Sequence, residues 1–134
     1  MRTTSVIIIA ISAFLAIPFP SSVAFAQEAA AGQRVFNQCR ACHTVELGGR
    51  NGVGPNLHGV FGRKAGSVEG FRYSSPMRQK GEQGLSWTEE TLRPYLQNPR
   101  EVVPGTNMAF NGIRNEQQLN DLIAYLKQAT GASP

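Results

Sequence analysis

The sequence predicts a mainly α-helical domain in which short helices are joined by glycine-rich loops. Near the carboxyl terminus, apolar residues recur at the i, i+3, i+4 and i+7 spacing of a helix buried on one face, at Leu119, Leu122, Ile123 and Leu126. Residues 44–70 are rich in glycine and carry few periodic apolar positions, which is typical of loop rather than sheet. No stretch reads convincingly as a strand, and no repeat or low-complexity segment is present.

Residues 1–26 have the pattern of a secretory signal peptide. Arg2 gives a positive start, residues 6–17 are almost wholly apolar, and Ala24-Phe25-Ala26 offers a small-x-small cleavage site. The apolar run is shorter than the stretch of about 20 residues that a membrane span needs. We therefore predict cleavage after Ala26 and a single domain at residues 27–134, with an uncleaved amino-terminal tether as the alternative.

The charge of the chain is modestly positive. The formal net charge is +4, and loss of Arg2 with the signal peptide leaves 12 basic and 9 acidic residues, a net charge of +3. No basic run is longer than Arg63-Lys64, and no aromatic residues interleave with basic ones, so binding to nucleic acid has little support. This charge suits an acidic protein partner or an anionic membrane surface.

The first predicted helix covers residues 28–38 and is amphipathic, with Gly32, Val35 and Phe36 facing inward. The glycine-rich loop follows at residues 44–70. It is not a simple flexible linker, because it carries apolar side chains that we expect to be buried, namely Val53, Leu57, Val60 and Phe61.

A short second helix is predicted to start with Ser75 as its cap and Pro76 in its first turn, and to end at Gly81 and Gly84. A third is predicted over residues 86–97, with two acidic residues, Glu89 and Glu90, near its positive amino end.

Two prolines shape the end of this third helix. Pro94 lies inside the helical pattern, so we expect a kink or a shifted boundary there, and Pro99 stops the segment. The last helix is predicted to begin at a capping pair, Asn115 with Gln118, and to terminate at Gly131.

The motif Cys39-Arg40-Ala41-Cys42-His43 carries the chemistry. On a helical turn, side chains at i and i+3 emerge on one face, so the two thiols can add to the two vinyl groups on one edge of a porphyrin. His43 follows Cys39 by one helical turn and can reach the iron from the same side. The spacing therefore predicts one covalently bound haem c with His43 as an axial ligand.

Three other interpretations of the cysteine pair are weaker. A redox dithiol would need a thioredoxin-like βαβ pattern nearby, and none is visible. A zinc site would need more ligands than His58, the only other histidine, can add. A structural disulfide would leave the adjacent His43 unexplained.

The second axial ligand decides whether the iron is closed or open to small molecules. The candidates are His58, Met77 and Met108. Met108 is favoured because it lies in the loop at residues 103–110, where a proline and a glycine allow its thioether to be laid against the iron. Met77 lies in a short helix and is more typical of core packing, and His58 of a packed or surface side chain.

Four segments resemble class I cytochrome c, closest to the mitochondrial protein and its bacterial periplasmic relatives: residues 39–45, 54–64, 95–99 and 121–127. The resemblance covers the whole mature chain, with a short insertion around Glu82 to Gly84. It implies a fold in which helices and glycine-rich loops wrap one covalently bound haem.

The resemblance also implies the roles of individual residues. Cys39 and Cys42 would form the thioethers, His43 and Met108 would ligate the iron, and the Pro55 carbonyl would orient His43. The other cofactor contacts that it implies are Arg63, Tyr73 and Trp87 near the propionates, Tyr95 near the Met108 sulfur and Thr106 ordering that loop. Gly32 and Phe36 would pack against Leu122 and Tyr125.

The function that the resemblance implies is one-electron transfer by a monomeric periplasmic carrier, without enzymatic activity. A quinol-oxidising cytochrome complex would be the donor, and a terminal oxidase or a photosynthetic reaction centre the acceptor, with transient docking at these membrane proteins. The rival function is that of a haem peroxidase or gas binder with Met108 displaced, but no distal acid-base group is clearly placed for it.

Two departures from the family pattern stand out. Met77 occupies a position where the mitochondrial proteins usually carry asparagine, so we expect different buried polar surroundings near the haem. Gln38, Glu101 and Asn107 stand where mitochondrial relatives usually have lysine, so we expect weaker steering of an acidic partner.

Overall fold

The structure is a computed structural model that describes residues 22–132, and the side chains of residues 28–132. This described part of the chain forms five helices in the order α1 (Ser22–Phe36), α2 (Ser75–Glu82), α3 (Glu89–Gln97), α4 (Pro99–Val102) and α5 (Glu116–Ala129). Residues 22–132 contain no strand, only an isolated antiparallel bridge between Lys64 and Ser86. The predicted mainly α class is confirmed. Most of the predicted signal peptide lies outside the described residues.

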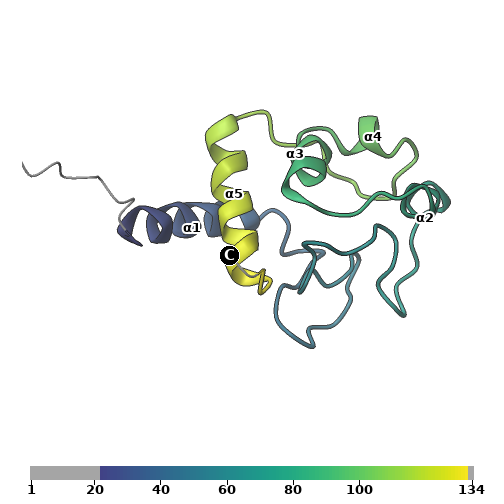
Figure 1. Cartoon of the computed structure of the whole chain (residues 1–134), viewed down its shortest axis with the longest axis horizontal. Coiled ribbons are helices and arrows are strands. Elements are labelled where there is room, and N and C mark those ends of the chain that lie inside the picture. Colours follow the sequence, from purple (N-terminus) through teal and green to yellow (C-terminus); the bar gives the residue numbers. More distant parts are fainter. Residues whose placement is uncertain (1–21, 133–134) are drawn as a thin grey trace, which may run out of the picture.

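Helices α1 and α5, from the two ends of the domain, cross each other (Figure 1). Gly32 makes the crossing possible, because a Cβ atom at this position would lie 2.6 Å from Cβ of Tyr125. One turn later, Phe36 is 2 % exposed, and its ring centroid lies 5.2 Å from that of Tyr125. Leu122 is fully buried. The predicted crossing of the first and last helices is therefore confirmed.

Helix α1 ends earlier than the predicted residue 38. It stops at Phe36, and the chain continues through turns in which Asn37 donates to the carbonyl of Arg34 and Gln38 to that of Val35. These bonds join residues three apart and tighten the chain, as is common where an α-helix ends. The cysteine motif therefore follows α1 and is not part of it.

The predicted cap of α2 was wrong by one residue. Ser74 is the N-cap, with extended backbone and a hydroxyl that accepts a hydrogen bond from Met77 N, whereas Ser75 is already helical. Gly81 does not end the helix. It lies within α2 where the helix meets the backbone of Ala65, and a side chain there would overlap the Ala65 carbonyl. The chain reverses two residues beyond the helix, at Gly84, where φ is +99°.

Helix α3 begins at Glu89, so the predicted start at residue 86 was also wrong. Thr88 is the N-cap, and it forms a reciprocal capping box with Thr91. The residues before it belong to a short backbone pairing: Ala65 N donates to Leu85 O at 2.8 Å, and Trp87 N to Arg63 O at 2.9 Å. Because residues 85 and 87 form these tertiary hydrogen bonds, they do not join the helix that the local sequence pattern predicted to start at residue 86.

The prolines and the last helix largely follow expectation. Pro94 lies inside α3, one turn before its end, while Pro99 ends that segment and starts the short α4. At α5, Gln118 N donates to the Asn115 side chain at 2.9 Å, which confirms the predicted cap. Beyond its end, Gly131 has φ of +73°.

The glycine-rich loop packs on the core formed by the helices. Val60 is buried, and Leu57 and Phe61 pack against the core, as predicted. Val53 was predicted to be buried and is instead 81 % exposed; it is one of the residues that line the cavity described below. Within residues 22–132, no helix is long and apolar enough to cross a membrane.

Candidate cofactor site

One cavity of about 300 Å³ lies between the loop at 44–70, the loop at 103–110 and helices α2, α3 and α5. Its walls are formed largely by apolar and aromatic side chains. All ten predicted site residues line it: Cys39, Cys42, His43, Pro55, Arg63, Tyr73, Trp87, Tyr95, Thr106 and Met108. Residues up to 69 positions apart in the sequence (39 to 108) thus converge on one space.

The cysteine motif forms a helical turn at the edge of this cavity. Cys42 N donates to Cys39 O at 3.0 Å and His43 N to the same carbonyl at 2.9 Å, which puts the three side chains on one side of the turn. The two cysteines are not joined in a disulfide. Burial, and then the neighbouring Cys42, raise the pKa of Cys39 to about 11. The turn therefore brings both thiols and His43 to the wall of the cavity, as the spacing predicted.

The imidazole of His43 is fixed by a hydrogen bond to one residue and by the close packing of another. Its Nδ1 lies 2.8 Å from the carbonyl oxygen of Pro55, the hydrogen bond that the resemblance implied. At Gly54, a Cβ atom would lie 2.7 Å from both ring nitrogens, so only glycine leaves room for the ring. Burial lowers the pKa of His43, and the bond to Pro55 opposes the shift. A neutral ring with Nδ1–H donating to Pro55 leaves Nε2 as a free electron-pair donor.

Met108 lies on the opposite loop, among contacts that restrain its sulfur. The backbone N–H of Met108 donates to Thr106 Oγ1 at 3.3 Å, so Thr106 orders the loop as predicted. The hydroxyl of Tyr95 donates to Met108 Sδ at 3.9 Å. Burial raises the pKa of Tyr95, while a hydrogen bond with Thr106 opposes the shift, so its proton is retained at neutral pH.

Arg63, Tyr73 and Trp87 share one region of the wall. The guanidinium of Arg63 donates from Nη1 to His58 O at 3.0 Å and from Nη2 to Asn56 O at 3.1 Å. Burial lowers the pKa of Arg63, and the proximity of Tyr73 opposes the shift. The ring of Trp87 packs 4.7 Å, centroid to centroid, from that of Tyr95. A half-buried cation is thus fixed in a largely apolar wall.

Comparison with known proteins gives a consistent result. The family described as Cytochrome c matches residues 29–130. The chain belongs to the cytochrome c family. It is 49 % identical over 105 residues to cytochrome c2 of Blastochloris viridis, covering 78 % of this chain and 80 % of the relative. It is 52 % identical over 100 residues to cytochrome c of Gibberella zeae (74 % and 92 %), and 45 % identical over 101 residues to that of Ginkgo biloba (75 % and 87 %).

Membership of the cytochrome c family makes the chain a haem-containing electron carrier with one covalently bound haem c and the class I fold. The residues of the cavity fit this cofactor. Paired thiols stand at its edge, imidazole and thioether side chains line it, and a guanidinium that could pair with carboxylates is fixed in its wall. Imidazole and thioether are the usual axial ligands of iron in cytochromes c.

Of the other two candidate ligands of this cytochrome c, one lines the cavity and one does not. His58 does not line the cavity; it packs against the end of α5, where a Cβ atom on Gly131 would lie 3.1 Å from its Cε1. Met77 is only 7 % exposed and is part of the core, as predicted, yet it also lines the cavity. At Met77, packing in the core and lining the cavity are therefore not alternatives.

Sequence reasoning missed several cavity residues, among them Phe71, Arg72, Phe110 and the glycine at 54. Phe110 could have been found, because it is a large apolar residue two positions after Met108 in the same loop. Nothing local marks Gly54 as the contact of His43, since eleven positions separate them and only the fold brings them together.

Proposed function

We propose that this cytochrome c is an exported carrier in which His43 and Met108 are the two axial ligands. The observation that carries the proposal is that both side chains line one cavity and each is restrained by a hydrogen bond, His43 by Pro55 and Met108 by Tyr95. When bound, the haem supplies one-electron cycling between ferric and ferrous iron. The protein supplies fixed ligands, so little has to move when the electron arrives or leaves.

The surroundings of the ligands support a carrier rather than an enzyme. Tyr95 and Met77 are both 7 % exposed, and with the buried Leu92 they form an apolar part of the cavity wall. The hydroxyl of Tyr95 is directed to the Met108 sulfur. This direction supports a role of Tyr95 in positioning Met108 rather than in acid-base chemistry on a substrate.

Replacement of Met108 tests the ligand assignment. Met108→Ala should leave the iron open, so the ferrous protein should bind carbon monoxide rapidly, whereas the wild type should not bind it. Met77→Leu is the matched control: it removes the other cavity thioether at similar volume, costs less than about 1.5 kcal/mol, and should leave carbon monoxide excluded. Rapid binding by the wild type would favour the gas-binder function, and rapid binding only by Met77→Leu would reassign the ligand.

We further propose that the protein acts in the bacterial periplasm after cleavage following Ala26. The signal pattern of residues 1–26 supports export, and one relative is a bacterial cytochrome c2. Mass spectrometry of the protein, purified from its natural source and then denatured, should give the mass of a chain that begins at Gln27 plus one haem. A chain that retains Met1 would instead favour a membrane tether.

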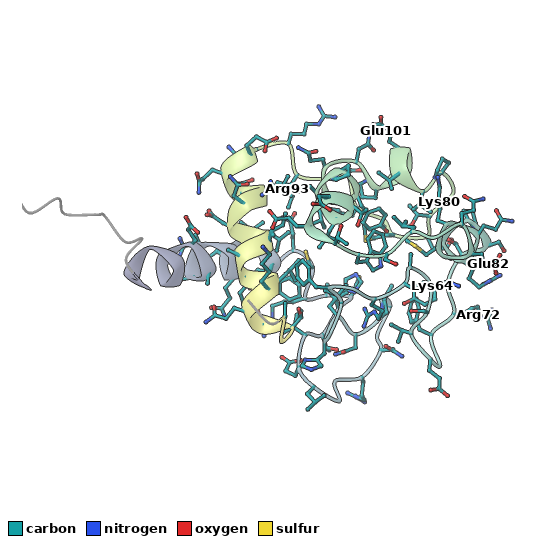
Figure 2. All side chains as sticks on the ribbon, viewed as in Figure 1. Lys64, Arg72, Lys80, Glu82, Arg93 and Glu101 are labelled. Atoms are coloured by element: carbon teal, nitrogen blue, oxygen red, sulfur yellow. The ribbon has the colours of Figure 1, made fainter. Side chains whose placement is uncertain are left out.

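We propose a quinol-oxidising cytochrome complex as donor and a terminal oxidase or photosynthetic reaction centre as acceptor, met by transient docking of a monomer. Basic residues near the cavity and near α2 support acidic partners, but they are mixed with acidic ones. Arg72 lines the cavity, and Lys64, Lys80 and Glu82 also lie at the end of the molecule that carries α2 (Figure 2). Steering should therefore be moderate.

A further inference from the structure

We propose that Asn56 is a positioning residue for His43: its side-chain amide closes the loop that presents the Pro55 carbonyl to the imidazole. The inference rests on the proposed ligation of iron by His43. It goes beyond that proposal, because it names a residue that contacts neither the imidazole nor the cavity and acts through its neighbour in the chain.

The amide of Asn56 joins both ends of this loop. Its Nδ2 donates to Thr44 Oγ1 at 2.6 Å and to Glu46 O at 3.0 Å, while its Oδ1 accepts from His58 N at 2.9 Å. This orientation of the amide is chemically determined, since the reverse would put oxygen against a carbonyl and NH₂ against an N–H. Every strong hydrogen-bonding group of the side chain is thus used.

The hydrogen bonds continue in one direction beyond Asn56. The hydroxyl oxygen of Thr44 accepts a hydrogen bond from Asn56 Nδ2, and the hydroxyl group donates one to Arg50 O at 2.9 Å. The backbone closes the same loop, with Leu57 N donating to Thr44 O at 2.8 Å. Thr44 directly follows His43, and Asn56 directly follows Pro55. The amide therefore bridges the residues adjoining the two partners of the imidazole hydrogen bond.

The loop is shaped to admit this amide. At Gly49, a Cβ atom would lie 2.5 Å from Asn56 Nδ2 and 2.8 Å from Thr44 Oγ1. Gly49 is not among the residues with positive φ, so a side chain there is prevented by the amide and its partners rather than by the backbone conformation. The space that a side chain at residue 49 would need is thus already filled by the Asn56 amide and the Thr44 hydroxyl.

The consequence for the site follows from the Pro55 carbonyl. A carbonyl that accepts the Nδ1 proton keeps the imidazole in one orientation and raises the basicity of the other nitrogen. If the amide of Asn56 holds the carbonyl in place, removing the amide should let the loop open locally and weaken this bond, even though no group touching His43 is changed.

Exchange of the His43 Nδ1 proton with solvent, measured by NMR on the ferrous holoprotein, tests the proposal. Asn56→Ala should accelerate this exchange about tenfold relative to the wild type, the change in opening equilibrium expected when one or two hydrogen bonds are lost. Gly49→Ala keeps every polar group but displaces the amide and its partner Thr44 Oγ1, so it should act in the same direction. It also serves if Asn56→Ala does not fold.

Asn115→Ala is the matched control, because it removes an asparagine side chain that accepts from a backbone N–H at the start of α5, away from the loop. It should accelerate exchange of the Leu122 amide in the core of α5 but not that of the His43 proton. Equal acceleration of both protons in all variants, or an unchanged His43 rate in Asn56→Ala and Gly49→Ala, would overturn the proposal. Absence of histidine ligation in the wild-type spectrum would instead overturn the proposed function.

Discussion

Replacement of Gly54 by alanine should disturb the site more than any other single methyl group added to the loop. The new Cβ would lie 2.7 Å from both ring nitrogens of His43, closer than non-bonded atoms can approach. The ring cannot simply swing away, because its Nδ1 is tied to the Pro55 carbonyl at 2.8 Å. The variant must therefore strain the loop or break this hydrogen bond.

The expected loss of stability adds an overpacking cost of about 1–3 kcal/mol to about 1 kcal/mol for the hydrogen bond, or roughly 2–4 kcal/mol in total. With a guanidinium slope of roughly 2–4 kcal/mol per molar, the unfolding midpoint should fall by about 1 M. Trp87 fluorescence can follow the unfolding of the holoprotein. The iron spectrum should change as well, because the imidazole is displaced.

Gly48→Ala is the control for this experiment. Gly48 has φ of +72°, and no other atom would lie within 4 Å of a Cβ atom at this position, so alanine there adds only backbone strain of about 1–2 kcal/mol. It should lower the midpoint less than Gly54→Ala and leave the iron spectrum unchanged. A Gly54→Ala protein with wild-type spectrum and a midpoint above that of Gly48→Ala would refute the close contact with His43.

Three further predictions concern the contacts around the site, the helices and the surface charge. Tyr95→Phe removes the proton donor of the Met108 sulfur, so potentiometry should show a lower reduction potential, by less than for Met108→Ala because the 3.9 Å contact is weak. The pKa of Glu89 is lowered by its hydrogen bond with Lys127 and then by that with Arg93. The ion pairs of Glu89 therefore stabilise the fold at pH values above the pKa that Glu89 has in the unfolded chain, and this stabilisation is lost as the pH falls through the lowered pKa of the folded state. Glu89→Gln should therefore cost less than about 1 kcal/mol in denaturant unfolding at pH 7, the usual limit for exposed pairs, and progressively less as the pH is lowered. Electron transfer to an acidic partner should slow moderately as salt rises in stopped-flow measurements, since charges are screened beyond about 10 Å at 0.1 M; a flat or rising rate would exclude such a partner.

Much of the site could be predicted because its chemistry is concentrated in short motifs. The spacing of Cys39, Cys42 and His43 requires only that the chain make one helical turn, and a helical turn is what forms. The stripe along α5 likewise predicts its buried face, since Leu119 and Leu122 are fully buried. Where a local pattern has a single physical outcome, it can be read from sequence.

The errors occurred where the sequence allows two local alternatives and only the folded structure selects one of them. Ser74 and Ser75 are both good caps, and only the backbone conformation selects Ser74. Residues 86–88 could continue a helix, but pairing with the segment around Arg63 draws Trp87 away from it. The role of Asn56 is of the same kind, because its partners become visible only when the loop is closed.

The absorption spectrum of the wild-type ferric protein tests the central claim most directly. Iron bound by methionine sulfur opposite histidine gives a weak far-red band, and ligation by His43 and Met108 predicts that the wild type and Met77→Leu have this band and that Met108→Ala lacks it. A wild-type protein without the band, or a band that survives Met108→Ala and disappears in Met77→Leu, would contradict the ligand set from which the carrier function is argued.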